Sequence, residues 1–217
     1  PSHSPEQLAS TVKQFALEDY FDACGIADAS LSGHESHYAH WLEQGYHADM
    51  AWMERSAAER HDVQHKLPGA QSVIVVIKNY YTPRPEASPD SGRVSRYAWG
   101  RDYHKVLKKP LIRLAKHIES LAPDTQTYSS VDTGPVLERT WAQRAGIGAI
   151  GKNSLVLRKD MGSWFFIGTI LTTLKLSPDA PLPDLCGTCT ACLDSCPTQA
   201  IVDNYQVDSN KCISYQT

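Results

Sequence analysis

The cysteines near the C-terminal end constrain this chain more than any other feature. Four of them follow the pattern C-x2-C-x2-C-x3-C-P over residues 186–197, the spacing by which bacterial-type ferredoxins hold [4Fe-4S] clusters. Zinc is the main alternative, because C-x2-C pairs also suit tetrahedral zinc sites. Zinc needs only two such pairs, however, and explains neither the third spacing nor the proline. The pattern therefore predicts iron–sulfur ligands at Cys186, Cys189, Cys192 and Cys196.

The other two cysteines differ in their surroundings. Cys212 lies further along the chain than Cys196, and we expect it to be a further ligand. Cys24 is far away beside Gly25, which favours a buried small hydrophobic residue. In two-cluster ferredoxins the first three thiolates bind one cluster and the fourth binds the other. The chain has six cysteines in all, so two clusters with four thiolates each would need ligands that it lacks.

Length and composition favour an ordinary globular protein. The 217 residues, 41% hydrophobic and 21% charged, suffice for one sizeable domain and a small appendage. There is no apolar run of about 18 residues and no pattern of a secretory signal at the start, so we expect no membrane association. Five of the six cysteines lie between residues 186 and 212, which fits metal-bound thiolates in a reducing cytoplasm better than a disulfide scaffold.

Charge is distributed unevenly along the chain. The net charge is −3, yet residues 93–116 carry eight basic residues against Asp102 alone. Three aromatic residues lie among them: Tyr97, Trp99 and Tyr103. A phosphate backbone and unstacked bases require such a combination, so the segment is a candidate nucleic-acid contact. The alternative is a solvated amphipathic helix with its cationic side outward.

The hydrophobic pattern predicts a mixed α/β domain followed by an iron–sulfur appendage. Helices are expected over residues 6–23 (ended by Gly25), 35–66 (two polar helices split near Gly45), 103–121 (capped by Asp102) and 135–145 (begun by Pro135 and ended by Gly146). Strands are expected over residues 72–77 (buried and central), 127–131, 154–157 and 164–172, with a turn at 159–162. Residues 82–92 are predicted to form a loop, and a proline-rich linker begins at Pro178.

A glycine motif at residues 146–151 matches G-x-G-x-x-G. A dinucleotide fingerprint must follow a strand and open a helix. Here the expected helix precedes the motif and the expected strand follows it, so nicotinamide or flavin binding is not predicted. Three glycines still permit the backbone to approach a large ligand closely.

Three histidines recur at every third position: His34, His37 and His40. A metal site is conceivable, but no carboxylates support it. A polar face of a helix or loop is the simpler interpretation.

Asp132 lies between an expected strand and an expected helix, in the segment Asp-Thr-Gly-Pro. One interpretation is a carboxylate that caps the helix. The other is an acid at the mouth of a pocket, with a pKa set by burial. The local sequence favours neither.

Taken together, these residues resemble the epoxyqueuosine reductase family, whose members complete the queuosine nucleoside in tRNA. The similarity covers nearly the whole chain, and the combination of Asp-Thr-Gly-Pro with Gly-Lys-Asn-Ser makes it specific. The matching segments are residues 67–70, 97–104, 131–139, 146–154, 186–197 and 211–215.

The resemblance implies a cobalamin-binding α/β (α+β) domain, similar to reductive dehalogenases and nitroreductase-like folds, over residues 1–177. A ferredoxin-like module for two [4Fe-4S] clusters would occupy residues 178–217. Asp132 matches the proton donor of the family, a role that requires a carboxyl protonated near neutrality. Further residues fall where the family contacts cobalamin: Arg55, Tyr97, Ser154 and Ser214, together with Asp132.

The family continues past the Cys-Ile-Ser-Tyr segment with more cysteines and a helical region, whereas this sequence stops at Thr217. We therefore expect a truncated protein that holds five of eight cluster ligands and could be inactive by itself. The resemblance implies reduction of epoxyqueuosine in the anticodon stem-loop of tRNA, with electrons from an external donor, by a cytoplasmic monomer. Two alternatives remain: a corrinoid reductase of small molecules, such as a dehalogenase, and a ferredoxin-like electron carrier.

Overall fold

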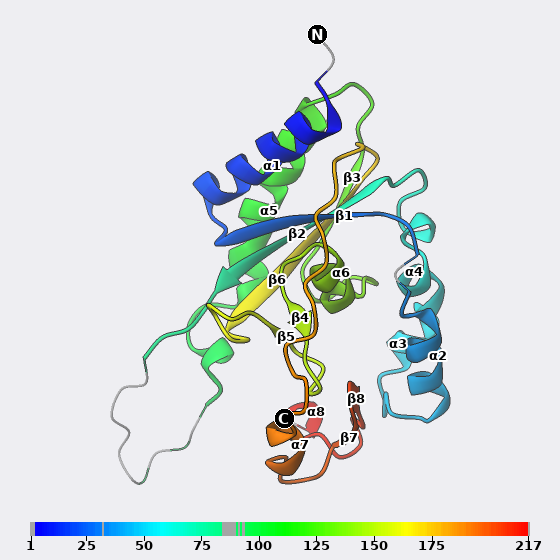
Figure 1. Cartoon of the computed structure of the whole chain (residues 1–217), viewed down its shortest axis with the longest axis vertical. Coiled ribbons are helices and arrows are strands. Elements are labelled where there is room, and N and C mark those ends of the chain that lie inside the picture. Colours follow the sequence, from blue (N-terminus) through cyan, green and yellow to red (C-terminus); the bar gives the residue numbers. More distant parts are fainter. Residues whose placement is uncertain (1–2, 32, 84–89, 91, 93, 217) are drawn as a thin grey trace.

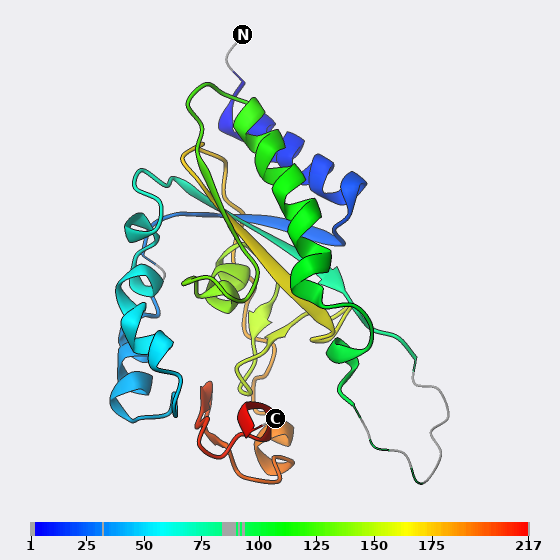
Figure 2. The same cartoon turned by 180° about the vertical axis from the view of Figure 1, so that it is seen from behind.

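The computed structural model describes residues 3–31, 33–83, 90, 92 and 94–216. Its centre is an antiparallel sheet of four strands in the order β1-β2-β6-β3. Helices α1 and α5 cover one face of this sheet and α6 packs on the other (Figures 1 and 2). The bounds are β1 (Ala23–Asp28), β2 (Ser72–Asn79), β3 (Thr127–Ser130), β6 (Phe165–Thr172), α1 (Pro5–Asp19), α5 (Tyr103–Ser120) and α6 (Glu138–Arg144).

Strand β2 contributes to both hydrophobic cores of the domain. Side chains alternate between the two faces of a strand, so Ile74 and Val76 join the core beneath α1 and α5. Val73 and Val75 join the opposite core, where they share a cluster with Trp141 of α6. Burial on both faces explains the continuous β-branched run, and the predicted central strand is confirmed.

Helix α1 begins as its sequence indicates but ends early. Ser4 and Gln7 form a capping box, and Pro5 is the first helical residue, as both signals favour. The prediction that Gly25 ends this helix is wrong, because Gly25 lies within β1. A β-carbon at Gly25 would clash with the backbone carbonyl oxygen of Ala145 at the end of α6. The glycine therefore permits close packing of β1 against α6.

The polar region after β1 divides near Gly45, as predicted. Gly45 has a φ of 67° and follows α2 (Glu35–Glu43), and a positive φ suits a glycine just past the end of a helix. The expected second helix is broken into three pieces, which are α3 (Ala51–Arg55), α4 (Ala57–His61) and the 3-10 turn η1 (Val63–His65).

Helix α5 confirms the prediction over residues 103–121 within one residue. Asp102 caps it by accepting the backbone N–H of His104 at 3.0 Å, a usual role for aspartate at a helix start. Its apolar side, which includes Leu107, Leu111 and Leu114, is buried. The strand predicted over 127–131 is β3, again within one residue. The loop predicted over 82–92 lies partly outside the described residues.

Helix α6 starts later than predicted, at Glu138 rather than Pro135. Residues 131–137 form tight turns instead, in which Thr133 N–H donates to Val131 O at 2.6 Å and Val136 N–H donates to Gly134 O at 2.9 Å. Leu137 occupies the cap position, so the interpretation of Asp132 as a helix cap is wrong. The predicted end is confirmed, because Gly146 follows the helix with a φ of 67°, the conformation that glycine commonly adopts there.

Two short strands follow α6. The glycine motif contains β4 (Ala149–Ile150), which pairs with β5 (Val156–Leu157). The prediction of a strand over 154–157 is right for only two residues, and β4 was not expected. The motif follows a helix and enters a strand, so the inverted order that argued against a dinucleotide fingerprint is confirmed.

The C-terminal residues form a small module below the sheet in Figure 1. The linker is attached to the domain, since Asp179 accepts hydrogen bonds from Lys13 and from the backbone N–H of Ile26. The module is attached through α2 and the following turn, where Trp41 Nε1 donates to Val207 O at 2.8 Å. Its elements are α7 (Ala191–Asp194), β7 (Ile201–Asp203), β8 (Gln206–Val207) and α8 (Ile213–Gln216).

Within the residues that the structure describes, no helix is both long and apolar enough to cross a membrane.

Candidate active site

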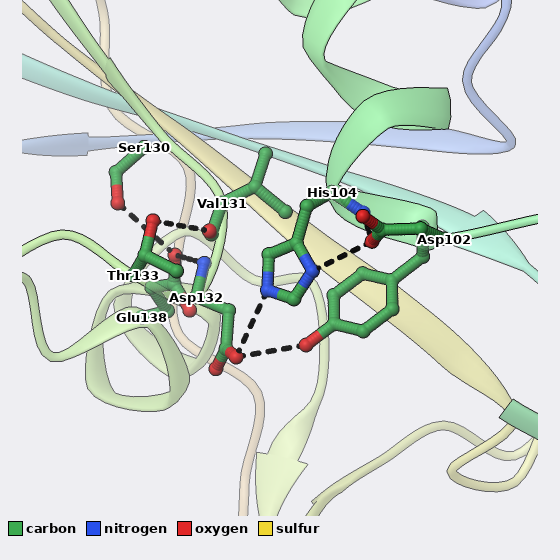
Figure 3. A network of polar contacts seen from close by, with 8 residues as sticks. Asp102, His104, Ser130, Val131, Asp132, Thr133 and Glu138 are labelled. Carbon is green, nitrogen blue, oxygen red and sulfur yellow. Dashed lines mark hydrogen bonds and ion pairs between the residues drawn. The ribbon is translucent and has the colours of Figure 1, made fainter. Parts of the chain in front are cut away.

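Asp132 lies just beyond the end of β3 with its carboxylate directed at α5 (Figure 3). Its φ is 59°, a left-handed conformation that aspartate tolerates better than most residues. Oδ2 accepts the hydroxyl proton of Tyr103 at 2.8 Å and lies 3.3 Å from Nε2 of His104. The unusual backbone conformation thus accompanies a carboxylate held by two side chains of one helix start.

His104 lies between two carboxylates. Its Nδ1 is 2.9 Å from Oδ1 of Asp102, and its Nε2 faces Asp132 on the other side. The two contacts hold the ring in place (Figure 3). Because one ring nitrogen faces each carboxylate, His104 is placed to pass a proton to Asp132.

Tyr103 is held by stacking. Its ring lies 4.3 Å from that of Phe166, with an angle of 4° between the planes, and 4.0 Å from the ring of His104. Desolvation raises the pKa of the Tyr103 hydroxyl, and the Asp132 carboxylate that it contacts raises it further, because both disfavour the phenolate. The phenol therefore stays protonated and acts as a donor to Asp132.

Glu138 approaches Asp132 from the opposite side. Its Oε1 accepts the backbone N–H of Asp132 at 2.8 Å and lies 3.4 Å from Oγ of Ser130. Burial raises the pKa of Glu138 to about 7, and the charge of Asp132 adds to this effect against the opposing backbone hydrogen bond. Sequence reasoning assigned no role to Glu138, Tyr103 or His104 at this site. The one sequence signal for these three residues was that they lie in segments 97–104 and 131–139, which carry the resemblance to a known family.

A cavity of about 160 Å³ opens beside these residues. Its walls are partly apolar, and Asp132, Tyr103 and Arg139 add polar groups at its edge. A carboxyl group at the wall of such a cavity can deliver a proton to the oxygen of a bound substrate. The lining residues are Tyr103, Asp132, Glu138, Arg139, Leu155, Val156, Ser163, Phe165, Phe166 and Ile167.

The predicted cofactor residues are only partly brought together. Ser154 is at the rim, since its carbonyl oxygen accepts from Nη1 of Arg139 at 2.9 Å and its neighbour Leu155 lines the cavity. Tyr97 is half exposed in the 3-10 turn η2 (Arg96–Ala98). Arg55 ends α3 and Ser214 lies in α8, and neither belongs to the cavity lining.

The predicted cluster ligands are free thiols on the C-terminal module. The loop at Cys186 is shaped by Asp184, which accepts the backbone N–H groups of Cys186 and Gly187 at 2.9 and 3.1 Å. Nearly buried Lys152 donates to Gly187 O at 2.8 Å. Backbone N–H groups, first that of Ala200, lower the pKa of Cys196 to about 7. Accessible thiolates supported by N–H groups are the donor type that an iron–sulfur cluster requires.

Within the described ranges, no three His, Cys, Asp or Glu side chains are grouped closely enough to hold a metal ion. This holds for the cysteines of the C-terminal module as well as for the three histidines. His34 precedes α2, and His37 Nε2 lies 3.2 Å from Tyr205 O. Cys24 is partly buried against the first core, so the prediction of a buried hydrophobic residue is confirmed only in part. Desolvation raises the pKa of its thiol to about 12.

The basic segment separates into two parts. On α5 the basic side chains are exposed opposite the buried leucines, so the amphipathic-helix interpretation is confirmed there. Before α5, Arg96 lies over the rings of Tyr81, Trp99 and Trp164, at 5.2, 5.5 and 4.9 Å from their centroids. These rings remain partly exposed, whereas Tyr103 belongs to the cavity.

Comparison with protein families gives two matches. Residues 60–133 match the family model described as epoxyqueuosine reductase QueG, DUF1730. Residues 185–217 match a 4Fe-4S double cluster binding domain.

Curated relatives are similar over most of the chain. An epoxyqueuosine reductase of Synechocystis is 52% identical over 178 residues, which cover 82% of this chain and 61% of the relative. One of Atelocyanobacterium thalassa is 46% identical, covering 97% of this chain and 69% of the relative. The chain thus spans 61% to 69% of the length of these relatives.

Solved structures share the fold. An epoxyqueuosine reductase bound to an epoxyqueuosine-modified tRNA-Tyr stem loop aligns with a TM-score of 0.83 at 30% identity, over 98% of this chain and 57% of that one. The enzyme of Bacillus subtilis, with its catalytic loop swung out of the active site, aligns with a TM-score of 0.82 at 29% identity, over 98% and 57%. A reductive dehalogenase aligns with a TM-score of 0.56 at 17% identity, over 99% and 30%, which indicates a shared fold alone.

Proposed function

Because this chain belongs to the epoxyqueuosine reductase family, we propose that the protein reduces epoxyqueuosine to queuosine in the anticodon loop of tRNA. The reaction consumes two electrons and two protons, breaks both epoxide C–O bonds, and yields an alkene and water. The observation that carries the proposal is the Asp132 carboxyl at the cavity wall, held by Tyr103 and His104.

Asp132 is the proton donor in this proposal. Protonation of the departing oxygen avoids the expulsion of an alkoxide, which makes a positioned acid worth about 10²–10⁴ in rate. Tyr103 orients the carboxyl. His104 resupplies the proton, and Asp102 holds the His104 ring through its Nδ1. Movement of this loop would be compatible with the relative in which the catalytic loop is swung out.

Cobalamin is the proposed cofactor of the domain formed by residues 1–177. When bound, it supplies a reduced cobalt centre that acts on the epoxide carbon. Leu155 lines the cavity with 43% of its surface exposed, which gives the cavity an apolar edge open to a large ligand. Residues proposed to hold it are Arg55, Tyr97, Asp132, Ser154 and Ser214.

The C-terminal module, residues 178–217, is proposed to hold part of two [4Fe-4S] clusters that supply electrons singly. Three cysteines would bind one cluster and two the other. Nearly buried Lys152 connects the module to the domain that holds Asp132. The proposed ligands are Cys186, Cys189, Cys192, Cys196 and Cys212.

The exposed rings around Arg96 and the cationic side of α5 are the proposed contacts for RNA. Aromatic side chains stack on unpaired bases, and lysine and arginine neutralise phosphates. Tyr81, Trp99 and Trp164 supply the rings here. Lys105, Lys108, Lys109 and Lys116 supply exposed charges.

The test is incubation of the full-length protein with epoxyqueuosine-containing tRNA and a strong reductant, followed by nucleoside analysis by mass spectrometry. We expect queuosine, with a mass lower by one oxygen atom. Persistence of the epoxide would overturn the proposed activity. Addition of cobalamin should change the corrin bands of the visible spectrum, and unchanged bands would instead favour a ferredoxin-like electron carrier.

A further inference from the structure

The side chain of Glu138 contacts Asp132 at its backbone N–H rather than at its carboxyl group. The loop that contains Asp132, residues 131–137, is called the acid loop. Oε1 of Glu138 accepts the N–H of Asp132 at 2.8 Å, while the Asp132 carboxylate faces Tyr103 on the other side. Glu138 is the first residue of α6 and its side chain is half-buried. The contact therefore joins the acid loop to an element that is packed against the central sheet.

The loop requires such an anchor. Asp132 holds a left-handed conformation with a φ of 59°, and a non-glycine residue stays in that region only where its surroundings determine it. The neighbouring turn bond, from Thr133 N–H to Val131 O, does not involve the Asp132 peptide N–H. Glu138 is the acceptor that the structure gives to this N–H.

A second contact supports the same carboxylate. Oγ of Ser130, the last residue of β3, lies 3.4 Å from Glu138 Oε1. A β-carbon at Gly134 would clash with this serine hydroxyl, so the loop closes tightly over the contact. Glu138 thus connects the strand, the loop and the helix at one point.

We infer that Glu138 is a positioning residue, whose side-chain oxygen anchors the Asp132 N–H and so keeps the acid directed at Tyr103 and into the cavity. The expected effect of Glu138 on turnover rests on the proposed function. The hydrogen bond that anchors the Asp132 N–H does not, because hydrogen exchange at that amide measures it separately.

The test compares the full-length wild-type protein with Glu138→Met and Glu138→Gln. Methionine has a similar length but no oxygen acceptor at that point, whereas glutamine keeps an amide oxygen. We expect faster hydrogen exchange at the Asp132 amide in Glu138→Met, together with a fall in kcat on the order of tenfold or more, because the Asp132 N–H is left without its hydrogen-bond acceptor. KM for the tRNA should change less than about twofold, because Glu138 affects the position of the acid during the reaction and not the binding of tRNA.

Glu138→Gln should retain both the slow exchange and most of the turnover. Glu119→Met is the matched control, because Glu119 accepts the hydroxyl of Thr127 at 2.5 Å far along α5, and it should leave exchange at Asp132 unchanged. If a thermal melt shows that Glu138→Met does not fold, Glu138→Asp replaces it in the test. Aspartate is shorter by one methylene, so its oxygen lies farther from the Asp132 N–H and hydrogen exchange at that amide should likewise be faster.

Wild-type exchange at Asp132 in the variants that withdraw the oxygen would overturn the anchor. Loss of turnover in Glu138→Gln equal to that in Glu138→Met would also overturn it, in favour of a role for the charge. Absence of epoxide reduction by the wild-type protein would count against the proposed function, while the exchange data would still decide the anchor.

Discussion

The hydroxyl of Tyr103 donates to Oδ2 of Asp132 at 2.8 Å, across 29 residues of sequence. Tyr103 is the first residue of α5 and Asp132 follows β3, so packing of this helix on the sheet creates the contact. A charge-assisted hydrogen bond of this kind fixes both the position and the orientation of the carboxyl.

Removal of that hydroxyl should slow the reaction without loosening the fold. Tyr103→Phe keeps the ring stacked on Phe166 but removes the phenolic donor to Asp132, which leaves only the longer contact with His104. We expect kcat to fall roughly tenfold, with KM for the tRNA little changed, as measured by nucleoside analysis. Tyr80→Phe is the matched control, because Tyr80 lies against the same Phe166 ring at 4.5 Å. An equal loss in both variants would assign the effect to packing.

Asp132→Asn should separate cofactor binding from proton donation. Asparagine has nearly the same shape but no acidic proton, so turnover should fall by about 100-fold or more. The visible spectrum on addition of cobalamin should match that of the wild type. Wild-type turnover in this variant would remove Asp132 from the chemistry.

Glu138 should make stability dependent on pH in a defined direction. Burial raises its folded-state pKa to about 7 from an ordinary 4.5, so the folded chain binds this proton more tightly than the unfolded chain. The stabilisation is therefore fully present below about pH 4.5 and is lost as the pH rises through about 7. Urea unfolding between about pH 5 and pH 8 should show the wild-type free energy of unfolding falling relative to Glu138→Gln. A constant difference between the two proteins over this range would contradict the assignment.

Gly25→Ala should destabilise the domain by forcing β1 away from α6. The added methyl group would clash with the carbonyl oxygen of Ala145, and overpacking of this kind costs about 1–3 kcal/mol in free energy of unfolding. Gly92→Ala is the control, since a β-carbon there meets no atom within 4 Å. Denaturant unfolding of both variants checks the expectation, which fails if they are equally stable.

Cys196→Ser should remove one of the two proposed clusters from the full-length protein. Quantification of iron and sulfide should show a fall from about eight to about four iron atoms per chain. Cys24→Ser should leave the iron content unchanged, because Cys24 packs against the first hydrophobic core. Equal iron content in the wild type and Cys196→Ser would exclude this cysteine as a ligand.

Local sequence signals predicted the elements that local forces control. Asp102 caps α5 through its own near neighbour His104, and the β-branched run of β2 is buried on both faces. The same approach misjudged Gly25 and the start of α6. At Gly25 a contact between distant segments decides the structure, because Ala145 approaches the glycine. At the start of α6 the contact is nearer along the chain, since Glu138 holds the Asp132 peptide six residues before it.

The family of the chain, the cysteine motif and the candidate acid Asp132 could be recognised from residue types at fixed spacing. The side chains that surround that acid could be identified only from the packing of the folded chain. Tyr103 and His104 come from α5 and Glu138 from α6, and they meet because both helices pack against the sheet. Hydrogen bonds of about 3 Å depend on that packing, which no spacing along the chain specifies.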